Sequence, residues 1–120
     1  MGKITSYKEL IAYQKSYELV LLIYRLSATF PKEEMYGLSS QIRRCAVSIP
    51  SNIAEGYMRG SKEYVQFMKI ALGSGAELET QISLSEDLGY LDQKSAKVAV
   101  ELCDEVIKLL KVYILKITNR

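Results

Sequence analysis

Residues 38–57 read LSSQIRRCAVSIPSNIAEGY, and this stretch decides the fold class of the chain. Its apolar side chains recur every three or four positions, as in an amphipathic α-helix, at Leu38, Ile42, Cys45, Ile49, Ile53 and Tyr57. A loop would disturb this repeat, yet the repeat keeps its phase across Pro50. Because proline removes one backbone hydrogen bond and crowds the preceding turn, we expect one continuous helix that is kinked at Pro50.

The same spacing continues on both sides of this stretch, and no segment alternates apolar and polar residues for long enough to form a strand. Turn and cap signals predict four helices, at residues 7–29, 33–59, 61–88 and 92–118. A capping box of Ser6 and Glu9 precedes the first helix, Gly60 ends the second, and Asp92 caps the fourth. Short connections make neighbouring helices antiparallel, so residues 1–120 are predicted to form one all-α domain, an up-down-up-down four-helix bundle.

The composition excludes several classes of protein. The chain has 120 residues, of which 48% are hydrophobic and 25% charged, with a formal net charge of +2, as in an ordinary globular domain. It has no histidine, which excludes Ser-His-Asp triads and His-ligated zinc. Cys45 and Cys103 lack a CxxC partner and are predicted to be reduced core thiols. We therefore expect no catalytic residue, cofactor or metal, and, with no export signal or membrane-length apolar run, a cytoplasmic protein.

Two of the expected helices carry more apolar surface than the core of a single bundle can cover. The six consecutive apolar residues from Leu19 to Tyr24 point in every direction around the first helix. On the fourth helix, the apolar residues between positions 106 and 114 form an unusually wide arc. A deep monomer core is one explanation, but we expect self-association. The interface candidates are Leu19, Leu22, Ile23, Ile107 and Ile114.

A polar stripe with helical spacing runs beside the apolar face of the second helix, at Gln41, Arg44, Ser48, Asn52 and Glu55. Polar groups so near a core need hydrogen-bond partners. Arg44 needs a carboxylate, which Glu77 or Glu79 of the third helix could provide beside the small residues Gly73 to Ala76. We interpret the stripe as structural packing; the alternatives are a device that sets the register of an oligomer, or a functional site.

Several stretches resemble a known protein family. They are FPKEEMYGL at 30–38, QIRRCAVSIPSNIAEGY at 41–57, ALGS at 71–74, ELE at 77–79 and LGYL at 88–91. Together they resemble the bacterial four-helix-bundle family known as 23S rRNA intervening-sequence proteins, over roughly residues 7–115, although Gly75 stands where a bulkier residue is usual. The resemblance implies a ring-like homo-oligomer, typically a homopentamer. A more distant similarity is to accessory proteins of diversity-generating retroelements, in which a basic pentamer binds nucleic acid and a reverse transcriptase.

These observations favour a non-enzymatic binding or scaffold protein whose partner is RNA, DNA or a nucleic-acid-processing protein, with no membrane and no small-molecule substrate. Contacts with nucleic acid would be electrostatic and blind to sequence, because the chain has no tryptophan, zinc finger or RNP-type motif. The candidate contacts are Arg43, Arg59, Lys62, Lys108, Lys111, Lys116 and Arg120. The alternative is a purely protein-protein interaction or an accessory subunit, since the helix dipole alone also favours cations at a helix C-terminus.

Overall fold

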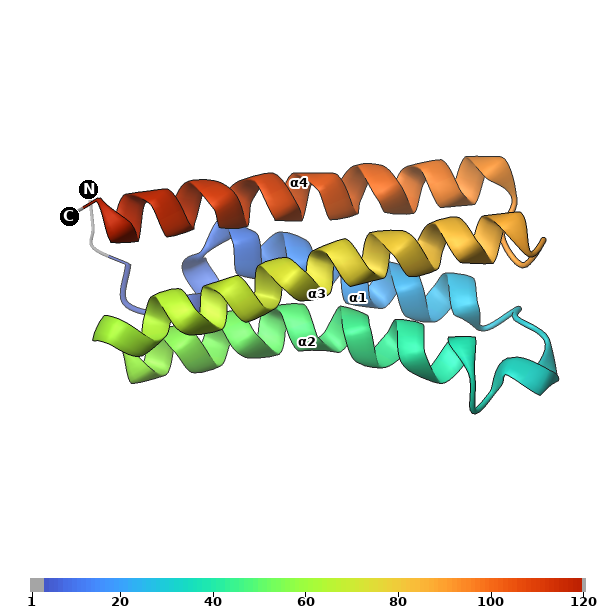
Figure 1. Ribbon diagram of the computed structural model, residues 1–120, viewed down its shortest axis with the longest axis horizontal. Coiled ribbons are helices and arrows are strands. Elements are labelled where there is room, and N and C mark those ends of the chain that lie inside the picture. The colour runs from blue at the N-terminus through green and yellow to red at the C-terminus, as the bar shows by residue number, and fades with distance from the viewer. Residues whose placement is uncertain (1–3, 120) are drawn as a thin grey trace.

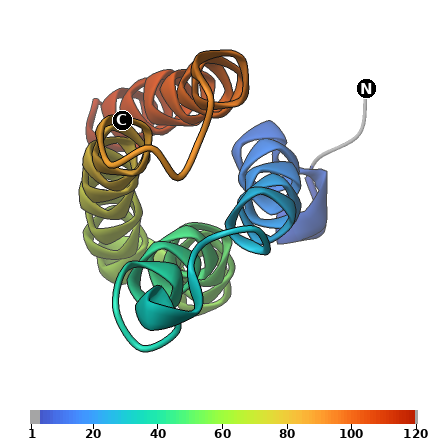
Figure 2. The same cartoon turned by 90° about the vertical axis from the view of Figure 1, so that its right-hand side faces the viewer.

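Four α-helices build the fold in the computed structural model, which describes residues 4–119. The elements in chain order are the 3-10 turn η1 (Tyr7–Glu9), α1 (Ile11–Ser27), the 3-10 turn η2 (Lys32–Glu34), α2 (Leu38–Arg59), α3 (Ser61–Asp87) and α4 (Gln93–Thr118). Consecutive helices run in opposite directions (Figure 1), and seen end-on they follow one another around a common axis (Figure 2). The expected all-α bundle is confirmed, and no strand occurs in the described residues.

The first helix differs from the expected range of 7–29 because its N-terminal part is a separate turn. The capping box is present: the Ser6 hydroxyl accepts from the Lys8 N–H at 3.2 Å, and the Glu9 carboxylate accepts from the Ser6 N–H at 3.3 Å. It caps η1 instead of α1, since the extended backbone of Leu10 (ψ 128°) separates the two elements. The Leu10 side chain is 2% exposed, so its burial in the core accompanies the break.

The other helix boundaries lie closer to expectation, with one exception. α2 begins at Leu38 instead of residue 33, because the acidic residues expected in its first turn form η2. One of them, Glu34, accepts a hydrogen bond from the Leu38 N–H at 2.9 Å and so caps α2 from outside the helix. At the start of α4, Asp92 accepts from the Ser95 N–H at 2.7 Å, as its predicted role as N-cap requires. α2 then runs without a break through Pro50, and the kink there stays a prediction.

The core lies along the bundle axis and takes residues from all four helices. The large side chains with less than 2% exposure include Ile42, Ile49 and Ile53 of the apolar stripe on α2. Leu19 and Ile23 of α1 are 0% and 1% exposed in this same core. Their prediction as oligomer contacts is therefore corrected, because neither leaves any surface for a second copy.

Glycines let the helices approach closely at two places. A Cβ atom on Gly56 of α2 would lie 2.7 Å from the Cβ of Phe67 on α3, well inside van der Waals contact. A Cβ on Gly75 of α3 would lie 2.9 Å from Cγ1 of Ile107 on α4, whereas one on Gly73 would meet nothing within 4 Å. Of the two glycines in the predicted small-residue patch, only Gly75 is needed for close packing, and it faces α4.

A chain of tyrosine rings joins the N-terminal elements to α2 and α3. In order, it consists of Tyr17, Tyr13, Tyr7, Tyr57 and Tyr64, with centroid separations of 6.0, 5.1, 6.4 and 6.0 Å. The Tyr57 hydroxyl also donates a hydrogen bond to the Ile4 carbonyl at 3.1 Å. Because edge-to-face ring pairs add stability beyond the area they bury, the chain holds η1 against the body of the bundle.

Candidate functional site

The centre of the predicted polar stripe is a network between α2 and α3. The hydroxyl oxygens of Ser48 and Ser74 are 2.9 Å apart, and the Asn52 amide donates to the Ser48 carbonyl at 2.7 Å and to its hydroxyl at 3.0 Å. The Cys45 thiol donates to the Ser74 carbonyl at 3.1 Å. These half-buried and buried groups therefore satisfy one another across the helix pair, as a structural network requires.

The remaining stripe residues, Gln41, Arg44 and Glu55, are exposed. Among the described residues Arg44 has no ion pair, so its predicted pairing with Glu77 or Glu79 is corrected. Glu79 instead lies beside Asp104 of α4, and a hydrogen bond between the two carboxyl groups raises the pKa of Glu79. Arg44 lines an open recess of about 310 Å³ between α2 and α3, together with Cys45, Ser48 and Ser74 of the network.

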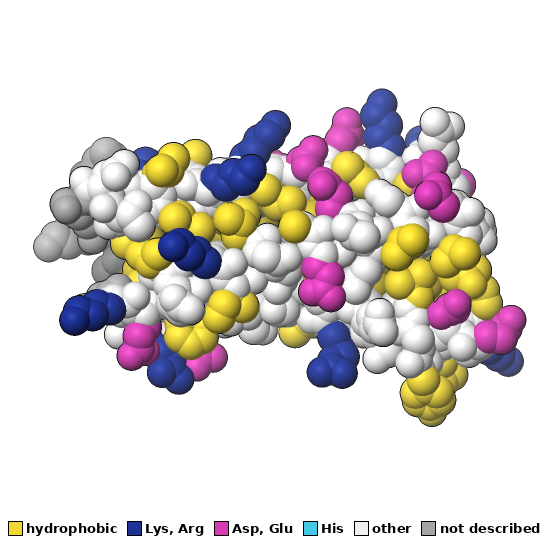
Figure 3. All heavy atoms as spheres, viewed as in Figure 1, with side chains coloured by type: hydrophobic (Ala, Val, Ile, Leu, Met, Phe, Trp, Pro, Cys, Tyr) yellow, Lys and Arg dark blue, Asp and Glu magenta, His cyan; other side chains and the backbone are white. Residues whose placement is uncertain are grey.

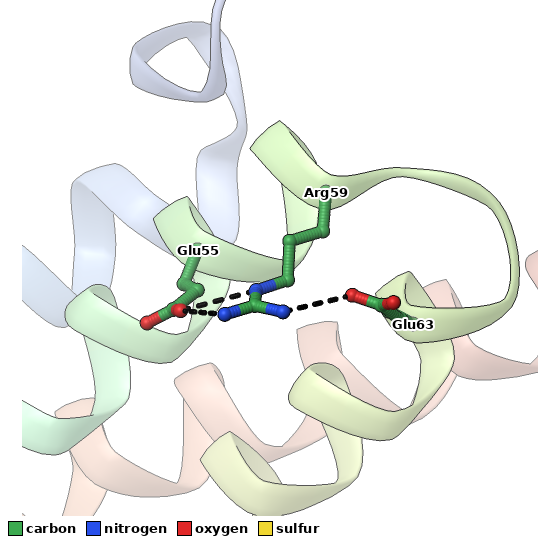
Figure 4. Close-up of polar contacts among 3 residues, drawn as sticks. All are labelled: Glu55, Arg59 and Glu63. Atoms are coloured by element: carbon green, nitrogen blue, oxygen red, sulfur yellow. Dashed lines mark hydrogen bonds and ion pairs between the residues drawn. The ribbon is translucent and has the colours of Figure 1, made fainter.

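Arg59 is held between two carboxylates at the junction of α2 and α3 (Figure 4). Its Nε and Nη2 atoms donate to Glu55 at 3.1 and 2.9 Å, and its Nη1 atom donates to Glu63 at 3.1 Å. The hydrogen bonds that Arg59 donates to Glu63, and then those to Glu55, raise the pKa of Arg59 above its ordinary value. With two carboxylates around one guanidinium the cluster carries a net negative charge, so Arg59 is removed from the candidate contacts for nucleic acid.

Arg43 is also occupied within the chain. Its Nε atom donates to the Ser27 hydroxyl at 2.7 Å and its Nη2 atom to the Tyr24 carbonyl at 3.3 Å. The guanidinium carbon lies 4.7 Å from the centroid of the Tyr24 ring, and the Ser27 hydroxyl donates in turn to the Ile23 carbonyl at 2.7 Å. Arg43 therefore bonds one carbonyl and one hydroxyl in the last turn of α1, where a cation is favoured, and ties α1 to α2.

Unlike Arg43 and Arg59, the lysines that were predicted to contact nucleic acid are not bonded within the part of the chain that the structure describes. Lys62, Lys108, Lys111 and Lys116 are exposed, and within the described residues none has a hydrogen-bond or ion-pair partner. Arg120 lies outside the described residues. On the face shown in Figure 3, basic side chains without acidic neighbours lie over the C-terminal half of α4, and the acidic side chains over α4 lie toward its other end.

The thiols of Cys45 and Cys103 are buried and are not activated as nucleophiles. Burial raises the pKa of Cys45 and of Cys103 to about 12, and the nearby carboxylates of Glu77 and Glu79, respectively, act in the same direction. Each thiol donates to a backbone carbonyl of α3. The protonated thiol is a poor nucleophile, so neither is activated at neutral pH. In the described part of the chain no three His, Cys, Asp or Glu side chains gather to hold a metal ion, and no helix is long and apolar enough to cross a bilayer.

An apolar groove of about 340 Å³ lies between α1 and α2. It is lined by side chains that include Tyr17, Leu21 and Val47, which are 52%, 50% and 38% exposed. The sequence did not identify these residues as a groove. All residues from Leu19 to Tyr24 are apolar, so only the rotation of α1 about its axis shows that Leu21 faces outward. The interface candidates Leu22, Ile107 and Ile114 are half-buried against the core.

Apolar side chains also gather on the face formed by α3 and α4 (Figure 3). The large apolar residues exposed on these helices, or at Leu88 directly after α3, are Ile70, Leu84, Leu88, Val98, Val112 and Leu115. The molecule therefore keeps apolar surface on two sides.

Fold and surfaces together define a class of protein, the small up-down-up-down helical bundle with a polar network between helices and apolar faces outside. The chain belongs to the family described as 23S rRNA-intervening sequence protein, which it matches over residues 8–112. A solved structure from Bacteroides thetaiotaomicron VPI-5482, a protein of unknown function from the S23 ribosomal protein family, is similar with a TM-score of 0.80 and 26% identity, covering 87% of this chain and 95% of that one. No curated protein matches the chain.

Proposed function

We propose that this chain is a non-enzymatic binding protein that works as a homo-oligomer and binds RNA or DNA weakly, without reading its sequence. The observation that carries the proposal is the uncovered apolar surface, above all the groove of Tyr17, Leu21 and Val47 between α1 and α2. Large apolar patches on a soluble protein mark interaction sites. A second copy of the chain is the proposed occupant, and the family resemblance favours a ring of five.

The nucleic-acid part of the proposal is supported by the lysines near the C-terminal end of α4. Lys108, Lys111 and Lys116 are exposed and have no ion-pair partner in the described residues, so their charges are available to phosphates. Lys108 and Lys111 are three positions apart and so are neighbours on the helix surface. A ring repeats such weak contacts in every subunit, and avidity then strengthens binding without any new contact.

Assembly is tested by light scattering on purified protein. One chain has a mass of 13.6 kDa, and we expect a multiple of that value at micromolar concentration. Leu21→Glu places a charge in the groove and should dissociate the assembly. The control is Ser83→Glu, which adds the same charge at an exposed polar position of α3. A single-chain mass for the parent protein would overturn the oligomer.

Nucleic-acid binding is tested by a gel-shift titration with a mixed-sequence RNA. Raising salt from about 50 to about 200 mM should weaken binding steeply, because phosphate contacts release counterions. The double variant Lys108→Glu with Lys111→Glu should bind less, and the control Lys94→Glu with Lys97→Glu makes the same charge change nearer the start of α4. An absent shift at low salt would remove nucleic acid as a partner and leave the protein-protein alternative, which the apolar groove favours.

A further inference from the structure

A second recess, of about 460 Å³, opens where α1 passes through η2 into α2. Its size falls within the roughly 300–1,000 Å³ typical of small-molecule sites. Three cations line it, namely Lys32, Arg43 and Arg44, and no Asp or Glu does. In a chain with a formal net charge of +2, this is a local concentration of positive charge that selects an anionic ligand.

The three cations are available to a ligand in different ways. Arg44 and Lys32 are exposed and have no partner in the described part of the chain. Arg43 is fixed by its bonds to Ser27 and Tyr24, which use two N–H groups of the guanidinium and leave the others unbonded within the described residues. Arg43 is thus held in place, whereas Lys32 and Arg44 are free to contact a ligand. An arginine guanidinium also offers paired N–H donors that suit a phosphate.

A serine hydroxyl can contact the same ligand. Ser39, in the first turn of α2, lines the recess, is 9% exposed, and has no hydrogen-bond partner among the described residues. Its hydroxyl oxygen stays accessible, so it can donate a hydrogen bond to an anion in the recess. Glu34, the acid that caps α2, does not compete for these groups, because its two oxygens accept from the Leu38 N–H and from the Tyr90 hydroxyl, both at 2.9 Å.

An aromatic side chain completes the recess. Tyr36 lines it and is 93% exposed, more than any other large apolar residue that the structure describes. An exposed ring of this kind is a stacking platform for a nucleobase. We infer that the recess binds a nucleotide, with Arg44, Lys32 and the Ser39 hydroxyl around the phosphate and Tyr36 against the base.

This inference goes beyond the proposed function, because the recess lies at the end of the bundle opposite to the C-terminal end of α4 (Figure 1). A nucleotide can reach the recess as a free nucleoside monophosphate or as the 5′-phosphorylated end of an RNA. The phosphate and ring chemistry is common to both, and the experiment separates them.

The test is calorimetric titration of the full-length protein with AMP, inorganic phosphate and adenosine. AMP should bind with a millimolar or lower dissociation constant and more tightly than either fragment, because only AMP offers both the charge and the ring. Arg44→Gln and Lys32→Gln should each weaken AMP binding about tenfold, the loss expected from one charge-assisted contact. Tyr36→Ala should weaken AMP and leave inorganic phosphate unchanged. Lys97→Gln, an exposed cation on α4, is the matched control and should change nothing.

Two short RNAs of one sequence, with a 5′-phosphate or a 5′-hydroxyl, identify the source of the nucleotide. If the 5′-phosphorylated RNA binds more tightly than the 5′-hydroxyl RNA, and Arg44→Gln removes this difference, the recess binds RNA ends. If AMP binds but the two RNAs bind equally, the recess binds free nucleotides. The inference is overturned if neither AMP nor 5′-phosphorylated RNA saturates the protein, or if Arg44→Gln, shown to be folded by circular dichroism, binds as well as the parent. The Lys108 and Lys111 variants leave this test unaffected, so each proposal can fail alone.

Discussion

Replacing Gly56 by alanine tests the closest approach in the bundle. The new Cβ would lie 2.7 Å from the Phe67 Cβ and 3.3 Å from the Tyr64 carbonyl oxygen, where carbon atoms rest at about 3.5–4.0 Å. Neither neighbour can rotate away, because a carbonyl oxygen and a Cβ are fixed to the backbone. α2 and α3 must therefore separate to accept one methyl group.

The magnitude follows from two opposing effects. Alanine favours a helix interior by about 1 kcal/mol over glycine, whereas overpacking costs about 1–3 kcal/mol. Because the 2.7 Å contact is with an atom that cannot move away, the cost should lie at about 2–3 kcal/mol, which leaves a net loss of about 1–2 kcal/mol in the free energy of unfolding for Gly56→Ala. Gly73→Ala is the matched control, since its Cβ meets nothing within 4 Å and should gain about 0.5–1 kcal/mol.

The assay is urea unfolding followed by far-ultraviolet circular dichroism. All variants are compared at one protein concentration, because assembly shifts apparent stability. The two substitutions should move the midpoint in opposite directions. A Gly56→Ala midpoint equal to or above that of the parent would refute the packing argument.

Three further outcomes follow from the site. Asn52→Ala should lower the free energy of unfolding by about 1 kcal/mol because it breaks the α2–α3 network, while Arg44→Ala, at an exposed and unpaired position, should stay within about 0.5 kcal/mol in the same urea assay. Cys45 and Cys103 should resist a thiol reagent in the native protein and react once urea unfolds it, since burial raises both pKa values to about 12; fast native labelling would contradict this. The hydrogen bond from the Leu38 N–H lowers the pKa of Glu34, so its stabilising contribution is present above the ordinary pKa of 4.5 and is lost as the pH falls through the lower folded-state value. Glu34→Gln should therefore melt lower than the parent at neutral pH and lose less on acidification, and parallel melting profiles would disprove this role.

The periodic features of the chain were predictable from sequence. The stripe through Ile42, Ile49 and Ile53 forms core as expected, and Asp92 and the capping box of Ser6 lie where local rules put them. These features depend on residues only a few positions apart, whose geometry the helix itself sets.

Partners between helices were harder to predict, because they depend on how each helix is rotated about its axis. Leu19 and Leu21 are two positions apart, yet one is core and the other lines the outer groove. For the same reason, the sequence did not show that Arg43 would bond the end of α1. It also did not show that Arg44 would lack its expected carboxylate partner among the described residues. Lys32 and Tyr36 precede α2 by only a few residues, but the sequence does not show that the chain turns so that both line one recess with Arg43 and Arg44.

The chain of tyrosine rings gives the protein an optical probe of its own. The sequence has nine tyrosines and no tryptophan, so near-ultraviolet circular dichroism comes mainly from tyrosine pairs held in fixed orientation. Two of the four contacts in the chain pass through Tyr7 in the η1 turn. Detachment of this turn would therefore weaken the near-ultraviolet signal while the helical signal stays almost constant. An unlabelled sample can thus report whether η1 opens in the proposed tests of assembly and of RNA binding.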